Sequence, residues 1–283
     1  MDTKLKKIII IVVSIIVVIS LFFIYSRYIE PKKFKIKEYA IRNSNIPDSF
    51  YGVKIVHLSD IHYKSTTDYS DLKKIVNKIN LIKPDIVIIS GDIFDSSIEY
   101  SDKDYNKIKK LLQNIDYNIG KYAIKGEEDL NISKWEEIIN DSEFVNLNDS
   151  YDLIYNEGID PILLVGVSSN YKKNHINKTI EDINKQINTE YKYSILVLHE
   201  PDFIDDIINL KFNLALAGHS HGGAIKLPFV GGIIKDKYSK EYYKDYYRID
   251  NTNLFISNGI GTDKYKLRFR NTPSINLYRL RNK

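Results

Sequence analysis

Histidine and aspartate residues gather in five short motifs of this chain, and four of its six histidines fall inside them. Imidazole nitrogens and carboxylate oxygens are ligands that divalent metal ions take in proteins. In chain order, the motifs are Asp60-Ile61-His62, Gly91-Asp92, Gly126-Glu127-Glu128-Asp129, His199-Glu200-Pro201 and Gly218-His219-Ser220-His221-Gly222-Gly223. Several of them follow short apolar runs that are typical of buried strands. In α/β proteins, sites are assembled at the ends of such strands. Together the motifs predict a site for a pair of divalent metal ions.

Taken singly, each motif also has a purely structural interpretation. Asp60 and His62 form a pair that is common on protein surfaces. Asp92 could lie in a turn that ends a strand, and His199 could be an ordinary core histidine. His219-Ser220-His221 is the strongest single signal. It offers two histidines, and its flanking glycines allow the backbone to approach a bound ligand closely. Side chains two positions apart on a strand point to the same side, so we expect the two members of each pair to share a direction.

Composition limits the kinds of site that this chain can build. It contains no cysteine, which excludes thiolate metal sites, disulfide bonds and a cysteine nucleophile. Nitrogen and oxygen ligands then allow Mn, Fe, Zn, Co or Ni as the bound ions. The net charge of +4 comes from 41 basic and 37 acidic residues spread along the chain, so no basic stripe indicates a nucleic-acid partner. A hydrophobic fraction of 43% in 283 residues is typical of one large globular domain, or at most two small ones.

A charge-free apolar run near the amino terminus is the second strong signal. It covers residues 8–25 and, at about 1.5 Å per residue, would be roughly 27 Å long as a helix, close to the hydrocarbon thickness of a bilayer. The sequence therefore predicts a short tail at residues 1–7 and one transmembrane anchor at residues 8–25. A buried core helix and a cleavable signal peptide are the alternatives. The residues after the run, Ser26-Arg27-Tyr28, lack the small-x-small pattern of a cleavage site, which favours an uncleaved anchor.

Basic residues on the two sides of this run bear on its orientation in the cell membrane. Those before it are Lys4, Lys6 and Lys7, and those after it are Arg27, Lys32, Lys33, Lys35 and Lys37. The larger number after the run favours a cytoplasmic domain. A very short lysine-bearing tail nevertheless resembles a signal-anchor, so we expect a single-pass protein whose catalytic domain lies outside the cytoplasm.

The rest of the chain predicts alternating strands and helices. Residues 26–50, bounded by Pro31 and Pro47, are interpreted as a polar connector and the start of the domain, and residues 51–283 as the domain proper. Strands are expected at 53–58, 85–90, 122–124, 161–166, 194–198, 213–217, 243–249, 253–257 and 274–280. Helices are expected at 72–82 with Ser70 as a possible cap, at 105–115, after the capping box at 133–136, and around 180–187. This pattern indicates an α/β domain in which two sheets pack together and are flanked by helices.

Four sequence segments carry a resemblance to a known family: VHLSDIH, IISGDIFD, LVLHEPD and AGHSHGGAIKLP. From about Val53 to Leu280 the chain resembles a calcineurin-like metallophosphoesterase of the membrane-associated bacterial phosphodiesterase type. The resemblance implies a four-layer α/β/β/α sandwich that hydrolyses a phosphate ester with a metal-bridging hydroxide. One ion would then be held by Asp60, His62, Asp92 and His221. The second would be held by Asp92 as a bridge, and by His199, His219 and the residue at position 127.

The third motif departs from the family pattern. The family has Gly-Asn-His-Asp or Gly-Asn-His-Glu here, whereas this chain has a carboxylate, Glu127, in place of the amide ligand. Glu128 replaces the histidine that faces the leaving group, and it is retained with Asp92 as a catalytic candidate. Alternatively, both glutamates are solvated loop residues and the second ion is loose or absent. From the resemblance we expect a phosphodiesterase acting on a phosphoester, with a lipid- or envelope-linked substrate as one option. The competing hypothesis is a weak or inactive relative that binds a phosphorylated envelope component.

Overall fold

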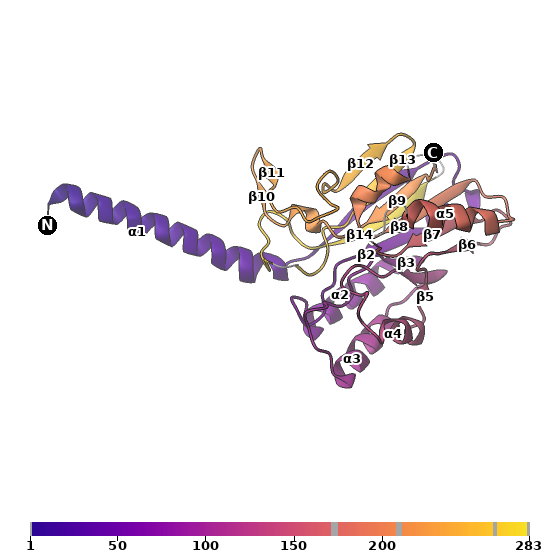
Figure 1. Ribbon diagram of the computed structural model, residues 1–283, viewed down its shortest axis with the longest axis horizontal. Helices are drawn as coiled ribbons and strands as arrows, with labels where there is room; N and C mark the ends of the chain where they lie inside the picture. Colours follow the sequence, from indigo (N-terminus) through magenta and orange to yellow (C-terminus); the bar gives the residue numbers. More distant parts are fainter. Residues whose placement is uncertain (1, 171–174, 208–210, 263–264, 282–283) are drawn as a thin grey trace.

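Two six-stranded sheets form the centre of the computed structural model, which describes residues 2–170, 175–207, 211–262 and 265–281 (Figure 1). The first sheet runs in the order β1 (Lys35–Arg42), β14 (Ser274–Arg281), β2 (Lys54–Leu58), β3 (Ile86–Ile89), β4 (Gly120–Ala123) and β5 (Val145–Asn146). The second runs in the order β12 (Tyr246–Ile249), β13 (Thr252–Ile256), β9 (Leu214–Ala217), β8 (Tyr193–Leu198), β7 (Ile162–Val167) and β6 (Ser150–Ile154). A separate short hairpin joins β10 (Lys226–Leu227) to β11 (Gly231–Gly232).

Helices cover the outer faces of both sheets. The first sheet packs against α2 (Tyr69–Ile82), α3 (Asp102–Gln113) and α4 (Trp135–Asp141). The second packs against α5 (His175–Gln186) and a 3₁₀ turn at Pro201–Asp206. Successive side chains of a buried strand serve alternate layers, since Val87 and Ile89 face the helices while Ile86 and Ile88 lie between the sheets. The expected four-layer α/β/β/α sandwich is confirmed.

Two helix starts differ from the expectation. Helix α2 is capped by Asp68, whose side chain accepts a hydrogen bond from the backbone N–H of Asp71, and not by Ser70. The capping box belongs to α3, where Ser101 and Asp104 form it reciprocally. Helix α4 has no side-chain cap, because its chain enters through a turn that is closed by a backbone bond from Trp135 to Ile132.

Residues 26–50 contain strand β1, which the sequence did not predict. Strand β1 pairs in parallel with β14 over its whole length, from Lys35 opposite Ser274 to Arg42 opposite Arg281. It forms the edge of the first sheet, where lysine and glutamate side chains face water and blunt the exposed edge. The same polar side chains hide the strand from a search for apolar runs.

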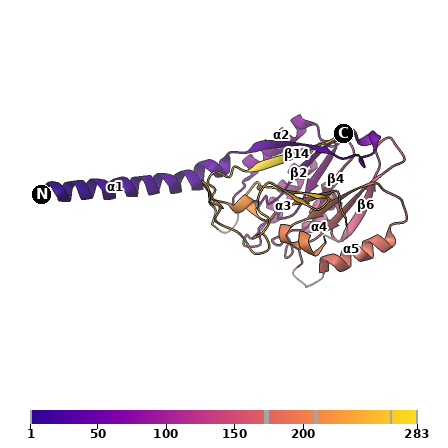
Figure 2. The same ribbon diagram turned by 90° about the horizontal axis from the view of Figure 1, so that it is seen from above.

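Helix α1 (Thr3–Ile24) projects from the domain as a single rod, as both views show (Figures 1 and 2). None of its residues is buried. Together with the turns that continue it to Lys32, it is the one helix in the described part of the chain that is long and apolar enough to cross a membrane.

The turns that follow α1 are docked onto the domain. Ser26 and Glu30 are buried. The backbone N–H of Arg268 donates to the carbonyl of Ser26 at 2.9 Å, and that of Asn271 donates to a carboxylate oxygen of Glu30 at 2.9 Å. The end of α1 and the segment around residues 268–271 therefore form one unit.

A chain that begins at Lys32 should fold but be less stable than one that begins at Tyr25. The shorter chain leaves the buried N–H of Asn271 without its acceptor, which costs about 1–3 kcal/mol. For a domain of this size, that loss lowers Tm by roughly 2–4 °C per kcal/mol. Thermal unfolding of the two chains in one buffer measures the difference. Equal Tm values would contradict the structural role of Ser26 and Glu30.

Candidate metal centre

The candidate residues lie on loops at the carboxyl ends of four central strands, drawn from both sheets. Asp60 and His62 follow β2, and Asp92 follows β3 in the first sheet. In the second sheet His199 follows β8, while His219 and His221 follow β9. All six side chains are buried. The packing of the two sheets thus brings together residues that are far apart in the sequence.

The backbone at these positions is left-handed rather than extended. The φ angles are 51° at Asp60, 45° at His62, 54° at Asp92, 62° at His219 and 45° at His221. Non-glycine residues rarely adopt such angles, and they persist only where the surroundings hold them. The expectation that strand alternation sets the side-chain directions is therefore wrong, since each motif lies beyond the end of its strand.

The six side chains form two groups. In each group, one ligand atom per residue lies within 4.8 Å of the others. The first group consists of Asp60, His62 and His221, and the second consists of Asp92, His199 and His219. Asp60 and His62 do converge, whereas His219 and His221 belong to different groups and do not share a direction.

Asp92 lies between the two groups. Its Oδ2 is 3.0 Å from Nε2 of His199 in its own group and 3.9 Å from Nε2 of His62 in the other. Asp60 makes the reciprocal approach, because its Oδ1 is 3.9 Å from Nε2 of His199. The two groups are thus neighbouring parts of one centre.

Backbone carbonyl groups fix the orientation of two histidines in the second group. Nδ1 of His199 lies 2.6 Å from the carbonyl oxygen of Ser90, and Nε2 of His219 lies 2.6 Å from that of Lys237. A carbonyl can only accept, so in each ring that nitrogen carries the proton and the other nitrogen is available to a metal ion. The available nitrogens are Nε2 of His199 and Nδ1 of His219.

The charges of the centre favour a bound cation. Burial alone would raise the pKa of Asp60 and of Asp92, but the neighbouring imidazoles bring both below their ordinary values. Burial lowers the pKa of His199, yet the Asp92 carboxylate raises it well above its ordinary value. The carboxylates are thus ionised and draw positive charge toward them. A divalent ion would take the place of the protons that the imidazoles otherwise hold. The nitrogen and oxygen donor set therefore fits two such ions.

The third motif contributes one carboxylate to the edge of the centre. Oε1 of Glu127 lies 3.7 Å from Nδ1 of His219, and burial raises the pKa of Glu127 to about 7. Glu128 is placed differently. Its backbone N–H donates to Oδ1 of Asp92 at 2.9 Å, while its carboxylate accepts hydrogen bonds from the N–H and hydroxyl of Ser96. The side chain of Glu128 therefore holds the loop after β3.

Replacing Gly126 with alanine should displace Asp92 and lower metal content. A Cβ at this position would lie 2.1 Å from Oδ1 of Asp92 and 2.6 Å from its backbone nitrogen. We expect metal affinity to fall by about 10-fold or more. Gly158→Ala is the matched control, since its nearest new neighbour is the Ser49 hydroxyl at 3.1 Å, away from the centre. Metal analysis of both variants tests this, and an unchanged metal content in Gly126→Ala would contradict the tight packing.

Several residues that support the centre were not predicted from the sequence. Asp95 lies 3.7 Å from Nδ1 of His62, and its place three residues after Asp92 was the available signal. The buried guanidinium of Arg268 donates to the carbonyl groups of Asn258, Gly259, Gly261 and Asn271. Gly259 packs so closely on Asp60 that a Cβ there would lie 2.9 Å from Cβ of Asp60. Arg268 thus holds the loop behind Asp60, and no local pattern reveals that role.

His57 is buried but lies outside both groups. Its Nε2 is 2.8 Å from the hydroxyl of Ser90, and burial lowers its pKa to about 3. The ring is therefore neutral and belongs to the packing of β2.

Comparisons with known proteins show which sequences the chain is similar to. A family model described as calcineurin-like phosphoesterase matches residues 53–223. The chain is 30% identical over 261 residues to the metallophosphoesterase YkuE of Bacillus subtilis, covering 91% of this chain and 89% of the relative. It is 23% identical over 317 residues to the UDP-2,3-diacylglucosamine pyrophosphatase LpxG of Chlamydia muridarum, covering 90% and 92%. It is also 26% identical over 206 residues to a transmembrane protein with metallophosphoesterase domain of Danio rerio, covering 68% of this chain and 45% of the relative.

Proposed function

This chain belongs to the calcineurin-like phosphoesterase family, and we propose that it is a membrane-anchored phosphodiesterase with two divalent metal ions. The observation that carries the proposal is the pair of buried histidine and aspartate groups with Asp92 between them. Such a pair suits two ions that act on one phosphoryl group.

Each group has a defined set of residues in this proposal. Asp60, His62 and His221 would hold one ion and His199 and His219 the other, with Asp92 shared between them. When bound, the ions would supply a water nucleophile at neutral pH and neutralise the charge of the phosphoryl oxygens.

The residues around the groups would keep these ligands in place. The carbonyls of Ser90 and Lys237 select the metal-facing nitrogens of His199 and His219. The backbone N–H of Glu128 holds Oδ1 of Asp92 and so turns Oδ2 toward both groups.

A substrate at the membrane surface is the second part of the proposal. It is supported by α1, whose 22 residues include no buried one, and by the LpxG relative of Chlamydia muridarum, whose name specifies a pyrophosphatase of UDP-2,3-diacylglucosamine. We propose a phosphodiester or phosphoanhydride that is attached to a lipid or to another envelope component. The domain would then lie outside the cytoplasm, with α1 as a single-pass anchor.

The altered third motif favours a second candidate function. Glu127 adds a carboxylate next to His219, and the side chain of Glu128 is engaged with Ser96 rather than available as a proton donor. A protein with these features could bind a phosphorylated envelope component and turn it over weakly or not at all.

Metal content and turnover of the purified full chain separate the two functions. The enzyme should bind about two metal ions per chain and hydrolyse bis-p-nitrophenyl phosphate, with both properties lost together on chelation. Metal binding without turnover would instead favour the binding protein. Flotation with vesicles tests the anchor, and protease accessibility in intact cells tests which side the domain faces.

A further inference from the structure

The β10–β11 hairpin exposes a compact set of apolar side chains. Phe229 at its tip is fully exposed, while Val230 and Ile233 expose 67% and 49% of their surfaces. The backbone of Phe229 is left-handed, with φ of 65°, which is unfavourable for a bulky side chain. Leaving this apolar tip in water is unfavourable, because the apolar side chains stay hydrated instead of being buried.

The base of the hairpin is tied to the end of α1 through one residue. The backbone N–H of Lys226 donates to the carbonyl of Phe269 at 2.9 Å, and the N–H of Phe269 donates to Ala224 at 3.2 Å. The ring of Phe269 packs on Phe22 in the last turns of α1, with 4.8 Å between the ring centroids. Figure 1 accordingly places β10 and β11 at the end of the domain from which α1 leaves, and Figure 2 shows α1 leaving from that end in the second view.

Lysine and tyrosine residues lie close in the chain to this apolar set and to the end of α1. Lys226, Lys235 and Lys237 lie on or next to the hairpin, and Lys235 lies over the ring of Tyr243 at 4.0 Å. At the end of α1, Lys33 lies over the ring of Tyr25 at 5.2 Å. Apolar residues bordered by lysine and tyrosine are typical of segments at the boundary between hydrocarbon and headgroups. Lysines there also attract anionic lipids.

We propose that the tip of the β10–β11 hairpin inserts into the same bilayer that α1 spans, as a second contact between the domain and the membrane. This inference rests on the membrane anchor of the proposed function and extends it. The occupant is the bilayer rather than a protein, because Phe269 ties the base of the hairpin to the last apolar turns of α1.

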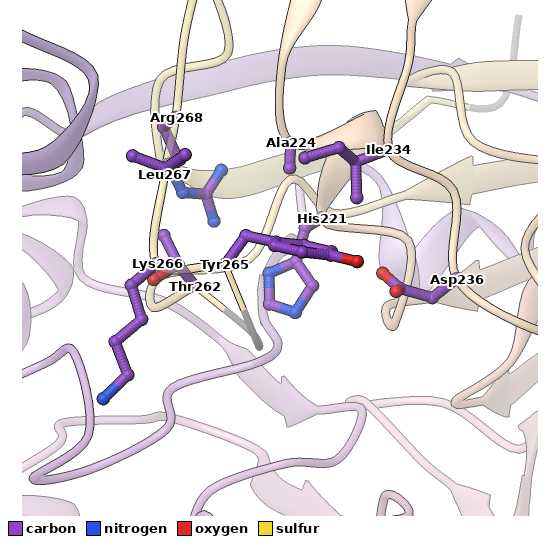
Figure 3. A pocket seen from close by; sticks show the side chains of 9 residues that line it. All are labelled: His221, Ala224, Ile234, Asp236, Thr262, Tyr265, Lys266, Leu267 and Arg268. Carbon is purple, nitrogen blue, oxygen red and sulfur yellow. The ribbon is translucent and has the colours of Figure 1, made fainter. Parts of the chain in front are cut away.

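A hollow beside His221 gives this contact a consequence for the substrate (Figure 3). Ala224 and Ile234 line it on the hairpin side, and Tyr265 and Arg268 line it on the segment that docks α1. Figure 3 shows the hydroxyl of Tyr265 and the carboxylate of Asp236 pointing toward one another near the His221 ring. Insertion of the tip would hold this hollow at the level of the headgroups. The His221 side of the centre would then face the membrane surface, from which a lipid-linked phosphoester would approach.

Single-cysteine labelling of the full chain tests the contact, because the native sequence has no cysteine. Phe229→Cys would be labelled with an environment-sensitive fluorophore and the chain reconstituted into vesicles of phosphatidylcholine and phosphatidylglycerol. Ile159→Cys is the matched control, since Ile159 is 90% exposed and lies before the amino end of β7, whereas the centre lies at the carboxyl ends of the neighbouring parallel strands. Nitroxide lipids quench a label in the bilayer, and aqueous iodide quenches a label in water.

The label at position 229 should be quenched by nitroxide lipid about two-fold or more above the control, and correspondingly less by iodide. Equal quenching at the two positions in chains that float with the vesicles would overturn the hairpin contact and leave the anchor intact. Protection from iodide without quenching by lipid would also overturn it, in favour of a protein partner. Chains that do not float would contradict the anchor itself. Since the measurement needs no turnover, loss of the proposed activity would not change its result.

Discussion

Asp92→Ala should leave the purified chain with almost no bound metal and lower kcat/KM for an aryl phosphodiester by more than about 100-fold. Oδ2 of Asp92 lies 3.0 Å from Nε2 of His199 and 3.9 Å from Nε2 of His62, so one carboxylate serves both groups. Loss of this carboxylate would remove one proposed ligand from each ion. It would also remove the negative charge that lies among the imidazoles of His62, His199 and His219. Metal analysis after dialysis and initial rates with added metal measure the two effects.

His57→Ala is the control for damage to the fold. His57 is equally buried but lies outside both groups, where it contacts the hydroxyl of Ser90 at 2.8 Å. Its removal should cost about 1–3 kcal/mol of folding free energy and leave the metal content unchanged. Thermal unfolding of both variants separates lost stability from lost metal. Equal metal content in wild type and Asp92→Ala would rule out the assignment of Asp92.

The fold was predictable where strands are buried on both faces. The runs that became β2, β3, β7 and β8 are apolar and bounded by polar turns, and these features place them in a covered sheet. Strand β1 was missed because it lies at the sheet edge, where half of its side chains meet water. Its partner β14 is more than 200 residues away, about as distant in sequence as two strands of this chain can be.

The composition of the centre was predictable, but its geometry was not. Histidine and aspartate types indicated metal ligands, and the family resemblance divided them into two sets, a division that stays a prediction. In the structure Asp60, His62 and His221 form one group and Asp92, His199 and His219 the other, with position 127 in neither. The prediction that His219 and His221 share a direction was wrong. Their backbone is left-handed rather than extended, and the two side chains lie in different groups. Arg268 gave no local signal either, since it acts through carbonyl groups on loops that come together only in the folded chain.

Glu127→Asn combined with Glu128→His should raise turnover, most strongly for phosphomonoesters and for poor leaving groups. Two divalent ions with Asp60, Asp92 and a hydroxide carry a net charge of about +1, which a ligating Glu127 would reduce to about zero. A phosphomonoester is close to a dianion at neutral pH, whereas a diester is a monoanion, so the extra carboxylate penalises the monoester more. The amide would remove that penalty.

The histidine would add the missing proton donor. In the native chain the Glu128 carboxylate accepts hydrogen bonds from Ser96, so it is not placed to protonate a leaving alkoxide. The native enzyme should therefore favour aryl diesters and phosphoanhydrides, whose leaving groups depart unaided. General-acid catalysis contributes about 10²- to 10⁴-fold, and we expect a gain of about 10-fold or more for alkyl phosphates in the double variant.

Rates for bis-aryl, mono-aryl and alkyl phosphates, with metal content measured in each protein, test both arguments. Ser96→Ala is the control, because it removes the hydroxyl bond to the Glu128 carboxylate, keeps the bond from the backbone N–H and supplies no imidazole. Native turnover of alkyl monoesters equal to that of aryl diesters would refute the leaving-group argument. If the double variant gained a second ion and activity that the native chain lacks, Glu127 would not be a competent ligand. The altered motif would then mark this chain as a protein that binds its phosphoester rather than cleaving it.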